Sequence, residues 1–353
     1  MQAPSVAVIG AGVIGRAHAA ILAALPPEQG RLASIVDPGP AAAAFAASLG
    51  VPHHAELDEM LAAERPDAAV IATPNVLHAP GAHACIDHGI AILVEKPLAN
   101  DFATARDVAS HAERADVPLL VGHFRRHNPV LKAARDLVQG GRLGRLLVVA
   151  ASSTVLKPDA YYSVAWRREA GGGPVLINLV HDIDALRFVC GEIDTVQALT
   201  ANAARGFAVE DTAAVLLRFR SGTLATISLS DATPSPWCWD QTAGENPTFP
   251  RHDANAYRLS GTDASLELPS LTLWRYEGAR GWDRRLTSET IDVERRDPLV
   301  EQMHHFLRVV RREEAPLVSG RDGARTLAAT LAVGRSATTG EVLQPEEAAE
   351  WAA

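Results

Sequence analysis

The sequence predicts an α/β protein with two domains. An N-terminal domain with a doubly wound parallel sheet is expected first, followed by a C-terminal α+β domain with a largely antiparallel, open sheet. In the first third of the chain, short apolar runs alternate with helix-length segments, which is typical of parallel βαβ units. After about Gly122, longer β-rich runs replace that alternation. At 353 residues the chain exceeds the usual size of one hydrophobic core, so we expect domains at 1–122 and 123–353.

The elements of the first domain follow from that alternation. Strands are expected at residues 6–9, 32–36, 68–72, 90–94 and 119–121. Helices are expected between them, near 13–25, 40–49, 56–63, 77–88 and 101–116. Short apolar runs separated by helices favour strands that are buried in a parallel sheet.

The second domain is predicted from its longer runs. After a helix near 129–139, strands are expected at 146–155, 195–201, 212–219 and 223–229, with a hairpin turn at 218–223. Gly173, Pro174 and Gly191 bound a helix from about 174 to 190, because Pro favours the first helical turn and Gly the position past the end. Helices near 298–313 and 321–338 close the chain and are able to pack back on the first domain.

A glycine-rich turn follows the first predicted strand. Residues 6–15 run a buried strand into G-x-G-x-x-G and then into a helix. Gly10 permits the tight turn, Gly12 lets backbone amides approach a pyrophosphate, and Gly15 lets the helix pack closely on the strand. The helix then points its amide-rich N-terminus at the phosphates. This pattern predicts a Rossmann domain that binds a dinucleotide through Gly10, Gly12, Val13, Ile14 and Gly15.

An acidic residue ends the second predicted strand. Asp37 lies 22 residues beyond Gly15, near the offset at which a carboxylate accepts hydrogen bonds from ribose hydroxyls. Pro38, Gly39 and Pro40 follow it, so no neighbouring Arg or Lys is available for a 2′-phosphate. The expected cofactor is therefore NAD rather than NADP.

Composition excludes several classes of protein. A net charge of −9 argues against a nucleic-acid partner or an anionic membrane surface. Cys85, Cys190 and Cys238 are odd in number and widely separated, which favours reduced thiols in a cytoplasmic protein. No basic segment precedes the first apolar run, and no run approaches the ~20 residues that span a bilayer. We expect a cytoplasmic protein without a membrane partner.

Several ordered motifs resemble one protein family. They are Glu95-Lys96-Pro97-Leu98, preceded by Ile71-Ala72-Thr73-Pro74-Asn75 and His78, then the segment 122–129, Gly171-Gly172-Gly173, His181-Asp182-Ile183-Asp184 and Gly261-Thr262. In this order they resemble the glucose-fructose oxidoreductase, inositol dehydrogenase and rhizopine catabolism (Gfo/Idh/MocA) family. The resemblance covers nearly the whole chain.

The resemblance implies an NAD-dependent oxidoreductase that acts on CH–OH groups. It implies that Lys96 is catalytic and reaches the substrate hydroxyl or carbonyl, next to a Lys–Pro peptide that is commonly cis. The implied neighbours of the cofactor are Thr73, Asn75 and Glu95, which border its nicotinamide half, and His78. It also implies a homodimer or homotetramer packed through the open sheet face.

Physical chemistry supports the role of Lys96. The residue follows a buried parallel strand, and open α/β sheets bind ligands at the carboxyl ends of their strands. An ammonium there stabilises the alkoxide-like oxygen that develops as hydride leaves the carbon.

His181 is the second catalytic candidate. The apolar stripe of its predicted helix runs from Leu176 to Cys190, and Asn178 and His181 project from a different face. A neutral imidazole, with an unperturbed pKa of ~6.5, can take the hydroxyl proton. The alternative is simple exposure; the resemblance favours catalysis.

One position departs from the commonest pattern of the family. Relatives that resemble inositol dehydrogenases usually carry Asp four residues before this histidine, where this chain has Ile177. Asn178 is the nearest polar neighbour, and its amide can orient the substrate or the imidazole without stabilising an imidazolium. Either the chemistry is tuned differently, or Asp182, Asp184 or a distant residue supplies the charge. For Asp184 we expect a structural role, in which it bonds nearby backbone or Arg187.

Aromatic residues are expected to line a substrate pocket. Two tryptophans lie among polar and turn residues directly after a strand, where flat rings pack against C–H faces of a sugar or cyclitol. A loop at a subunit interface explains that composition equally well. Further candidates precede the glycine triplet. The expected substrate residues are Arg125, Tyr161, Trp166, Arg167, Asn178, Trp237 and Trp239.

No metal is expected. His78, His83, Cys85 and His88 fall at helical offsets that do not bring three ligands together, and neither C-x-x-C nor H-E-x-x-H occurs. The sequence therefore predicts an NAD-dependent dehydrogenase for a secondary alcohol of a sugar, inositol or related cyclic polyol. Two alternatives stay open: an NAD-dependent, redox-neutral glycosidase, and a non-catalytic dinucleotide-binding sensor.

Overall fold

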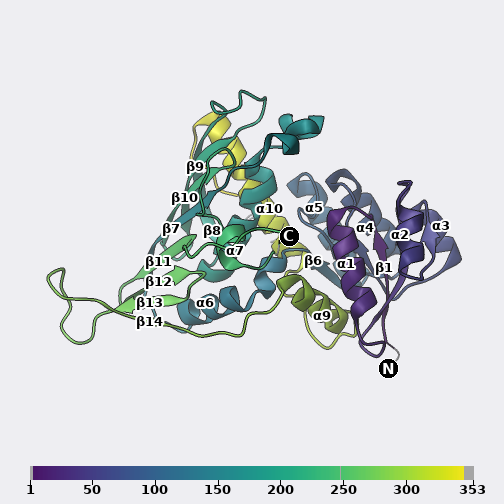
Figure 1. Cartoon of the computed structure of the whole chain (residues 1–353), viewed down its shortest axis with the longest axis horizontal. Helices are drawn as coiled ribbons and strands as arrows, with labels where there is room; N and C mark the ends of the chain where they lie inside the picture. The colour runs from purple at the N-terminus through teal and green to yellow at the C-terminus, as the bar shows by residue number, and fades with distance from the viewer. Residues whose placement is uncertain (1–2, 247, 346–353) are drawn as a thin grey trace. The chain divides into compact units, whose positions relative to one another are not determined.

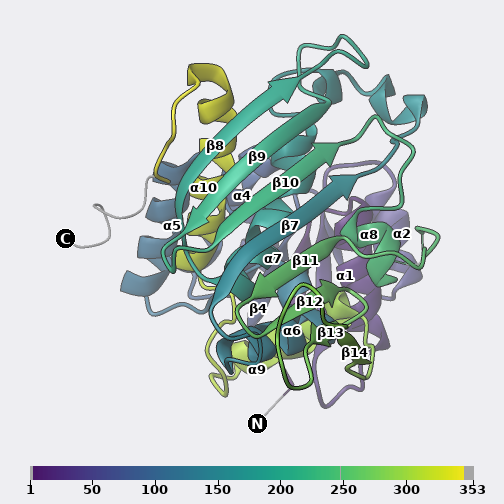
Figure 2. The ribbon, with the colours of Figure 1, turned by 90° about the vertical axis from the view of Figure 1, so that its left-hand side faces the viewer.

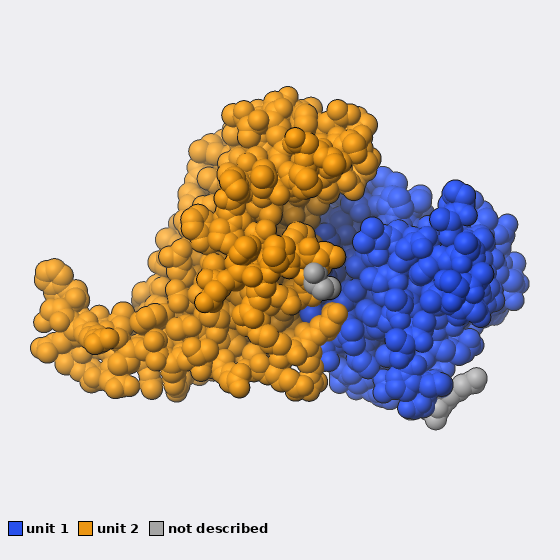
Figure 3. Space-filling model, viewed as in Figure 1, with its two compact units in different colours: residues 1–124, 298–327 blue, residues 125–297, 328–353 orange. Residues whose placement is uncertain are grey.

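The computed structural model describes residues 3–246 and 248–345. The chain divides into two compact units (Figure 3): unit 1 comprises residues 1–124 and 298–327, and unit 2 comprises residues 125–297 and 328–353. Helix α10 (Gly320–Thr339) belongs to unit 1 up to Leu327 and to unit 2 from Ala328. In the described part of the chain, every helix is too short or too polar to cross a membrane.

Unit 1 is built on sheet A, whose six described strands are all parallel and lie in the order β3-β2-β1-β4-β5-β6. The strands are β1 (Ser5–Ile9), β2 (Arg31–Val36), β3 (His53–His54), β4 (Ala68–Ile71), β5 (Ala91–Val94) and β6 (Leu119–Val121). The helices are α1 (Val13–Ala24), α2 (Ala42–Ser48), α3 (Leu57–Ala63), α4 (His78–Asp87), α5 (Phe102–Arg114) and α9 (Pro298–Val310), with a 3-10 turn η1 (Asn75–Leu77). This arrangement confirms the predicted doubly wound Rossmann sheet (Figure 1).

The central strands of sheet A are fully buried. Every residue of β1, β4 and β5 is buried, because helices pack on both faces of such a sheet and leave no wet face. This is why the strands read as continuous apolar runs. The short strand β3 was not predicted, since its two histidines carry no apolar signal.

Unit 2 is built on sheet B, with eight described strands in the order β14-β13-β12-β11-β7-β10-β9-β8 (Figure 2). They are β7 (Leu146–Thr154), β8 (Ile193–Ala201), β9 (Thr212–Phe219), β10 (Leu224–Ser230), β11 (Tyr257–Gly261), β12 (Ala264–Leu268), β13 (Thr272–Arg275) and β14 (Thr287–Thr290). Strands β7 and β10 are parallel and the other neighbours are antiparallel. The predicted, largely antiparallel sheet is therefore confirmed.

Strands β11 to β14 were missed from sequence. They are short, and in β12 only alternate positions face the core: Ala264, Leu266 and Leu268 are buried, while Ser265 and Glu267 are half-buried. A strand of four or five residues with this pattern leaves too few apolar positions to stand out from a loop. The predicted hairpin turn at 218–223 is confirmed by the antiparallel pairing of β9 and β10.

The helices of unit 2 are α6 (Pro129–Gln139), α7 (Val180–Cys190) and α8 (Trp239–Ala243), with short helical turns η2 (Phe124–His127), η3 (Asp159–Ser163), η4 (Ala165–Arg168) and η5 (Val175–Leu179). The helix predicted over 174–190 begins as the π-helical η5 and continues as α7 up to Gly191, whose φ is +97°. π-helical turns of this kind are rare and occur mostly at functional sites. The extent of this helix was predicted, but its π-helical start was not.

Candidate active site

The glycine turn lies at the carboxyl edge of sheet A. Gly10 follows β1 with a φ of +98°, and an added Cβ would lie 2.6 Å from the carbonyl carbon of Ala72. A Cβ on Gly15 would lie 1.9 Å from the carbonyl oxygen of Gly10, so helix α1 can cross the turn only without that side chain. Around Gly12, by contrast, a Cβ would meet no atom within 4 Å. The turn is therefore closed toward the protein and open at Gly12.

Helix α1 keeps its N-terminal amides available to a ligand. No side chain caps it, and its first turn has no acidic residue. Val13 is 93% exposed beside these amides, and Ile14 is half-buried. Helix α5 differs in having a side-chain cap, since Asp101 accepts a hydrogen bond from the Thr104 amide at 2.8 Å. An uncapped helix N-terminus with exposed amides suits a pyrophosphate.

Asp37 faces the glycine turn from the end of β2. One carboxylate oxygen accepts a hydrogen bond from the Ala11 amide at 2.7 Å, and the other accepts one from the Gly39 amide at 2.7 Å. The half-buried side chain thus lies against the turn, as a ribose-binding acid must. No Arg or Lys is among these partners.

Glu95 and His18 form a buried pair beside Lys96. His18 Nε2 lies 2.8 Å from Glu95 Oε1, and both side chains are almost inaccessible to water. Burial by itself raises the pKa of Glu95, but the hydrogen bond and charge of His18 and the charge of Lys96 outweigh it and lower that pKa. The other oxygen of Glu95 accepts the Lys96 amide at 3.3 Å. The pair holds the backbone at Lys96, which is half-buried and precedes a cis peptide to Pro97.

His78 supports the same edge from α4. Its Nδ1 lies 2.8 Å from the Pro97 carbonyl oxygen and its Nε2 lies 2.9 Å from the Thr73 carbonyl oxygen. The side chain is buried and links two loops of the edge at which the cofactor is expected. Thr73 Oγ1 is buried and has no hydrogen-bond partner in the described structure, and half-buried Asn75 begins η1 next to it. An unpaired hydroxyl at this edge fits a bound nicotinamide half.

In unit 2, Asn178 and His181 lie half-buried where η5 gives way to α7. Asn178 Oδ1 accepts a hydrogen bond from Lys157 Nζ at 2.7 Å. Lys157 lies in the loop after β7, and its Nζ is 3.2 Å from Asp231 Oδ2. Sequence reasoning did not select Lys157, although one signal was available. Of the 33 Lys and Arg residues, only Lys96, Lys132 and Lys157 are lysines.

Asp231 organises the loop that carries Lys157. Its carboxylate accepts hydrogen bonds from the Tyr162 hydroxyl at 2.5 Å and from Arg205 Nη1 at 2.5 Å. Its backbone carbonyl oxygen accepts the Lys157 amide at 2.9 Å. Burial lowers the pKa of Lys157, and the charges of Arg205 and Arg167 act in the same direction against that of Asp231.

Arg125 differs from the prediction that it contacts substrate. It is 4% exposed, and its guanidinium nitrogens lie 3.2 Å from Asp182, 2.9 Å from Asp240 and 3.5 Å from Glu245. The Tyr257 hydroxyl also donates to Asp182. Burial raises the pKa values of Asp182 and Glu245, although Arg125 opposes the change. A cation held by three carboxylates is part of the scaffold of unit 2.

Asp184 also has a structural partner. Its two oxygens accept hydrogen bonds from Arg126 Nε at 2.8 Å and Nη2 at 2.7 Å, and both residues are buried. The partner expected from sequence was the backbone or Arg187; Arg187 pairs with Glu192 at 2.8 Å. Asp182 and Asp184 thus both pair with scaffold residues. Neither replaces the aspartate that relatives carry at the position of Ile177.

The predicted aromatic residues separate into two groups. Trp239 is 1% exposed and stacks on Tyr257, with ring centroids 5.3 Å apart, so it belongs to the core and not to a surface pocket as expected. Trp237 is 56% exposed, and its carbonyl oxygen accepts the Thr154 amide at the end of β7. Trp166 is 49% exposed on η4.

Tyr161 and Arg167 lie together in the loop after β7. The Arg167 guanidinium carbon is 3.9 Å from the centre of the Tyr161 ring, and Arg167 Nη1 donates to the Tyr161 carbonyl oxygen at 2.8 Å. Lys157 Nζ is 4.7 Å from the centre of the same ring. The structure therefore gathers Tyr161, Arg167 and Lys157, and through Lys157 also Asn178.

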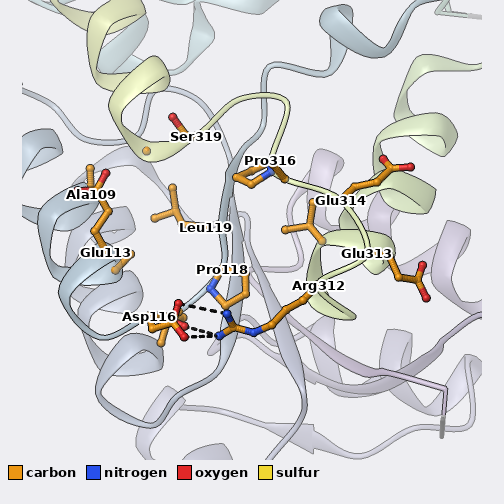
Figure 4. Close-up of a pocket in the computed structure, with 15 residues that line it drawn as sticks. Ala109, Glu113, Asp116, Pro118, Leu119, Arg312, Glu313, Glu314, Pro316 and Ser319 are labelled. Atoms are coloured by element: carbon orange, nitrogen blue, oxygen red, sulfur yellow. Dashed lines mark hydrogen bonds and ion pairs between the residues drawn. The ribbon is translucent and has the colours of Figure 1, made fainter.

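A cavity of about 540 Å³ in unit 1 lies elsewhere (Figure 4). Pro118 and Leu119 line it at the amino end of β6, and an ion pair between Arg312 and Asp116 borders it. Ligands of open parallel sheets bind at the carboxyl ends of strands, so this cavity is not the nucleotide site. No group of three His, Cys, Asp or Glu side chains in residues 3–246 and 248–345 could hold a metal ion. Burial raises the pKa of the free thiols of Cys85 and Cys190 to about 12.

The fold and the glycine turn together define a dinucleotide-binding class of protein. Comparison with known proteins identifies the family within that class. The family model described as "Oxidoreductase family, NAD-binding Rossmann fold" matches residues 5–123, and "GFO/IDH/MocA C-terminal domain" matches residues 131–267. The chain belongs to the Gfo/Idh/MocA family of NAD-binding oxidoreductases, as its motifs predicted.

Three similar proteins illustrate the match. Rhizopine catabolism protein MocA of Rhizobium meliloti is 30% identical over 271 residues, which cover 73% of this chain and 83% of that protein. Inositol 2-dehydrogenase of Rhizobium meliloti (strain 1021) is 32% identical over 228 residues, covering 63% of this chain and 67% of that protein. The crystal structure of the WlbA dehydrogenase from Bordetella pertussis, in complex with NADH and UDP-GlcNAcA, is 25% identical, covers 97% of this chain and 99% of that chain, and has a TM-score of 0.81.

Proposed function

We propose that the chain is an NAD-dependent dehydrogenase that transfers hydride between nicotinamide and a secondary alcohol of a sugar, inositol or related cyclic polyol. Lys96 binds the reacting oxygen and His181 carries its proton. The observation that carries the proposal is the position of Lys96: it follows β5 at the edge of sheet A where the glycine turn follows β1.

NAD fits the residues at this edge. The open position at Gly12, the uncapped α1 and Asp37 would hold the pyrophosphate and a ribose, and the unpaired Thr73 hydroxyl would lie at the nicotinamide half. When bound, NAD accepts hydride at C4 of the nicotinamide and NADH returns it. Asp37 is followed in the chain by Pro38, Gly39 and Pro40, and the lack of a basic residue among them favours NAD over NADP.

The side chains of this chain supply the proton chemistry. In oxidation, the alcohol carbon loses hydride, its hydroxyl proton passes to the His181 imidazole, and the C–O bond becomes a carbonyl. The Lys96 ammonium donates a hydrogen bond to the oxygen as negative charge develops on it. Glu95 and His18 keep the Lys96 backbone in place. Since Lys157 donates to its amide oxygen, Asn178 has its NH₂ group left for the substrate or for the imidazole.

The substrate class follows from the relatives and from the exposed aromatic residues. Relatives carry the names inositol 2-dehydrogenase and 1,5-anhydro-D-fructose reductase, and a similar structure contains UDP-GlcNAcA. Trp166 and Trp237 expose the flat rings that pack on sugar C–H faces.

The test is NADH formation at 340 nm with inositols, aldoses, sugar acids and quinate-like cyclitols, each with NAD and with NADP. We expect an NAD-only signal from at least one of these classes. Release of free sugar from a glycoside without net NADH would instead identify a redox-neutral glycosidase. Tight NAD binding without turnover of any compound would identify a sensor.

We further propose that the protein is a homodimer or homotetramer packed through the outer face of sheet B. That face exposes Leu199 at 71%, Leu216 at 51%, Leu224 at 52% and Val148 at 50% on four adjacent strands (Figure 2). Several large apolar side chains exposed on one face of a sheet favour association. Light scattering should give a multiple of the 37.5 kDa chain mass, and Leu216→Glu should lower it. A monomeric wild type would refute the assembly.

A further inference from the structure

Three cations gather in the loops of unit 2 beside Asn178. Lys157 and Arg167 both lie over the ring of Tyr161, at 4.7 Å and 3.9 Å from its centre. Arg205 lies 4.3 Å over the adjacent ring of Tyr162. The charges of Arg205 and Arg167 oppose the charged form of Lys157, because like charges repel and do so more strongly where protein replaces water.

Only one carboxylate pairs with these cations in the described part of the chain. Asp231 forms ion pairs with Lys157 at 3.2 Å and with Arg205 at 2.5 Å, and it also accepts a hydrogen bond from the Tyr162 hydroxyl. Its side chain is 3% exposed, so these partners leave it no further capacity. Nearby Asp211 is occupied by the backbone amides of Ala204 and Arg205. The cluster therefore carries excess positive charge in a chain whose net charge is −9.

Arg167 has no carboxylate partner among residues 3–246 and 248–345. Its described contacts are the Tyr161 carbonyl oxygen and the rings of Tyr161 and Trp166. Its Nε is buried and has no hydrogen-bond partner. Stacking fixes the plane of the guanidinium, and a fixed guanidinium with unused donors suits a planar, bidentate anion.

We propose that Lys157 and Arg167 form an anion subsite, and that the substrate is a sugar or cyclitol that bears a carboxylate or phosphate group. This inference rests on the proposed dehydrogenase function and extends that function by naming the charge of the substrate. Lys157 links the subsite to the helix that carries His181, because Lys157 Nζ donates a hydrogen bond to Asn178, three residues before His181. The anion would pair with Lys157 and Arg167 while the reacting alcohol lies toward His181. Neutral polyols would leave these two half-buried cations without an added partner.

The use of lysine at position 157 supports a function. Arginine supplies most of the positive charge of this chain, since only three of its 33 basic residues are lysines. Lysine is a compact point charge on a flexible stem, and it suits a ligand that must enter and leave. Burial and two neighbouring cations lower the pKa of Lys157, so the fold holds this charge in unfavourable surroundings beside its pairing with Asp231.

The experiment compares matched pairs of substrates with the full chain and NAD. D-glucuronate is compared with D-glucose, quinate with myo-inositol, and glucose 6-phosphate with D-glucose, by kcat/KM in the wild type, Arg167→Gln and Lys157→Gln. We expect the wild type to prefer a charged member. Each variant should lower the ratio of kcat/KM for the charged member over that for the neutral member about 30-fold. The sugar-acid and phosphate arms distinguish the two anions.

Arg168→Gln is the matched control. Arg168 is the exposed neighbour of Arg167 and forms no described ion pair, so its charge is removed from the same loop without touching Tyr161. It should retain the preference for the charged substrate. Equal losses in Arg167→Gln and Arg168→Gln would reduce the effect to general electrostatics and overturn the proposal.

The outcomes separate the two proposals. Turnover of neutral substrates without a preference for their charged partners would overturn the anion subsite and leave the dehydrogenase intact. If no compound yields NADH, the proposed dehydrogenase function is refuted. Calorimetry with D-glucuronate and glucose 6-phosphate on the NADH-loaded protein then tests the anion subsite by itself. Binding of either anion that is lost in Arg167→Gln would support the subsite; binding of neither would overturn it.

Discussion

The loop after β5 in unit 1 and the loop after β7 in unit 2 each present a half-buried lysine, in opposite electrostatic surroundings. Lys96 follows a buried carboxylate, Glu95, whose negative charge is secured by His18. Lys157 shares one carboxylate, Asp231, with Arg205 and has Arg167 as a further neighbour. Negative charge thus accompanies the first lysine, and excess positive charge surrounds the second.

The difference indicates two tasks. A lysine that stabilises charge developing on a reacting oxygen needs a rigid position and a balanced neighbourhood, and the end of a buried strand supplies both. A lysine that binds a substrate anion needs an attractive field, which a surplus of cations supplies. Substitutions in the two loops should therefore fail in different ways.

The largest effect is expected for Lys96→Ala. Turnover should fall by about 10³-fold, because the transition state loses its charge stabilisation, while the Kd for NAD stays within a few-fold. Steady-state kinetics and calorimetry measure the two quantities. Lys132→Ala, which removes the third lysine of the chain, is the control. Parental turnover in Lys96→Ala would disprove the mechanism.

Asp37→Ser should change the choice of cofactor next. Removing the carboxylate takes away the ribose contact and the repulsion of a 2′-phosphate, so the ratio of kcat/KM for NAD over NADP should fall by about 10²-fold. Rates with the two cofactors at a fixed substrate concentration provide the measurement. An unchanged ratio would show that this edge does not read the ribose.

His18→Ala should sharpen the contrast between the two lysines. It leaves the buried Glu95 without its partner, which costs about 1–3 kcal/mol of unfolding free energy in urea. The folded pKa of Glu95 lies below its ordinary 4.5, so this stabilisation is present above pH 4.5 and is lost as the pH falls through the folded value. The difference between wild type and variant should shrink accordingly in acid. His88→Ala, at an exposed position, should match the wild type at every pH.

The smallest effect is expected for the stability of Lys157→Gln. The folded pKa of Lys157 lies below its ordinary 10.5, so the charged lysine costs stability at neutral pH, and that cost disappears as the pH rises toward 10.5. The urea midpoint of the wild type should therefore rise relative to that of the variant between pH 8 and pH 10. A constant difference in urea midpoint across this range would contradict the prediction that the charged form of Lys157 lowers the stability of the fold.

Local patterns determined most of unit 1 from sequence. Gly10, Gly15 and Asp37 have roles that depend on a turn, a crossing helix and a strand end a few residues away, and the structure places them at one edge of sheet A as expected. Strands buried on both faces are continuous apolar runs, which are visible without knowing their neighbours. The extent of the helix ahead of Gly191 was likewise set by Pro and Gly at its ends.

Only the tertiary structure decided which charged and aromatic side chains are available to a substrate. Arg125 and Arg167 were both predicted from sequence to contact the substrate. In the described part of the chain, three carboxylates from distant segments form ion pairs with Arg125, and none pairs with Arg167. Trp237 and Trp239 are two residues apart, and packing against Tyr257 places one in the core and leaves the other exposed. Lys157 meets Asn178 and Asp231 across 21 and 74 residues of chain. Turn and strand signals are local in the sequence, whereas the pairing of charges depends on segments that only folding brings together.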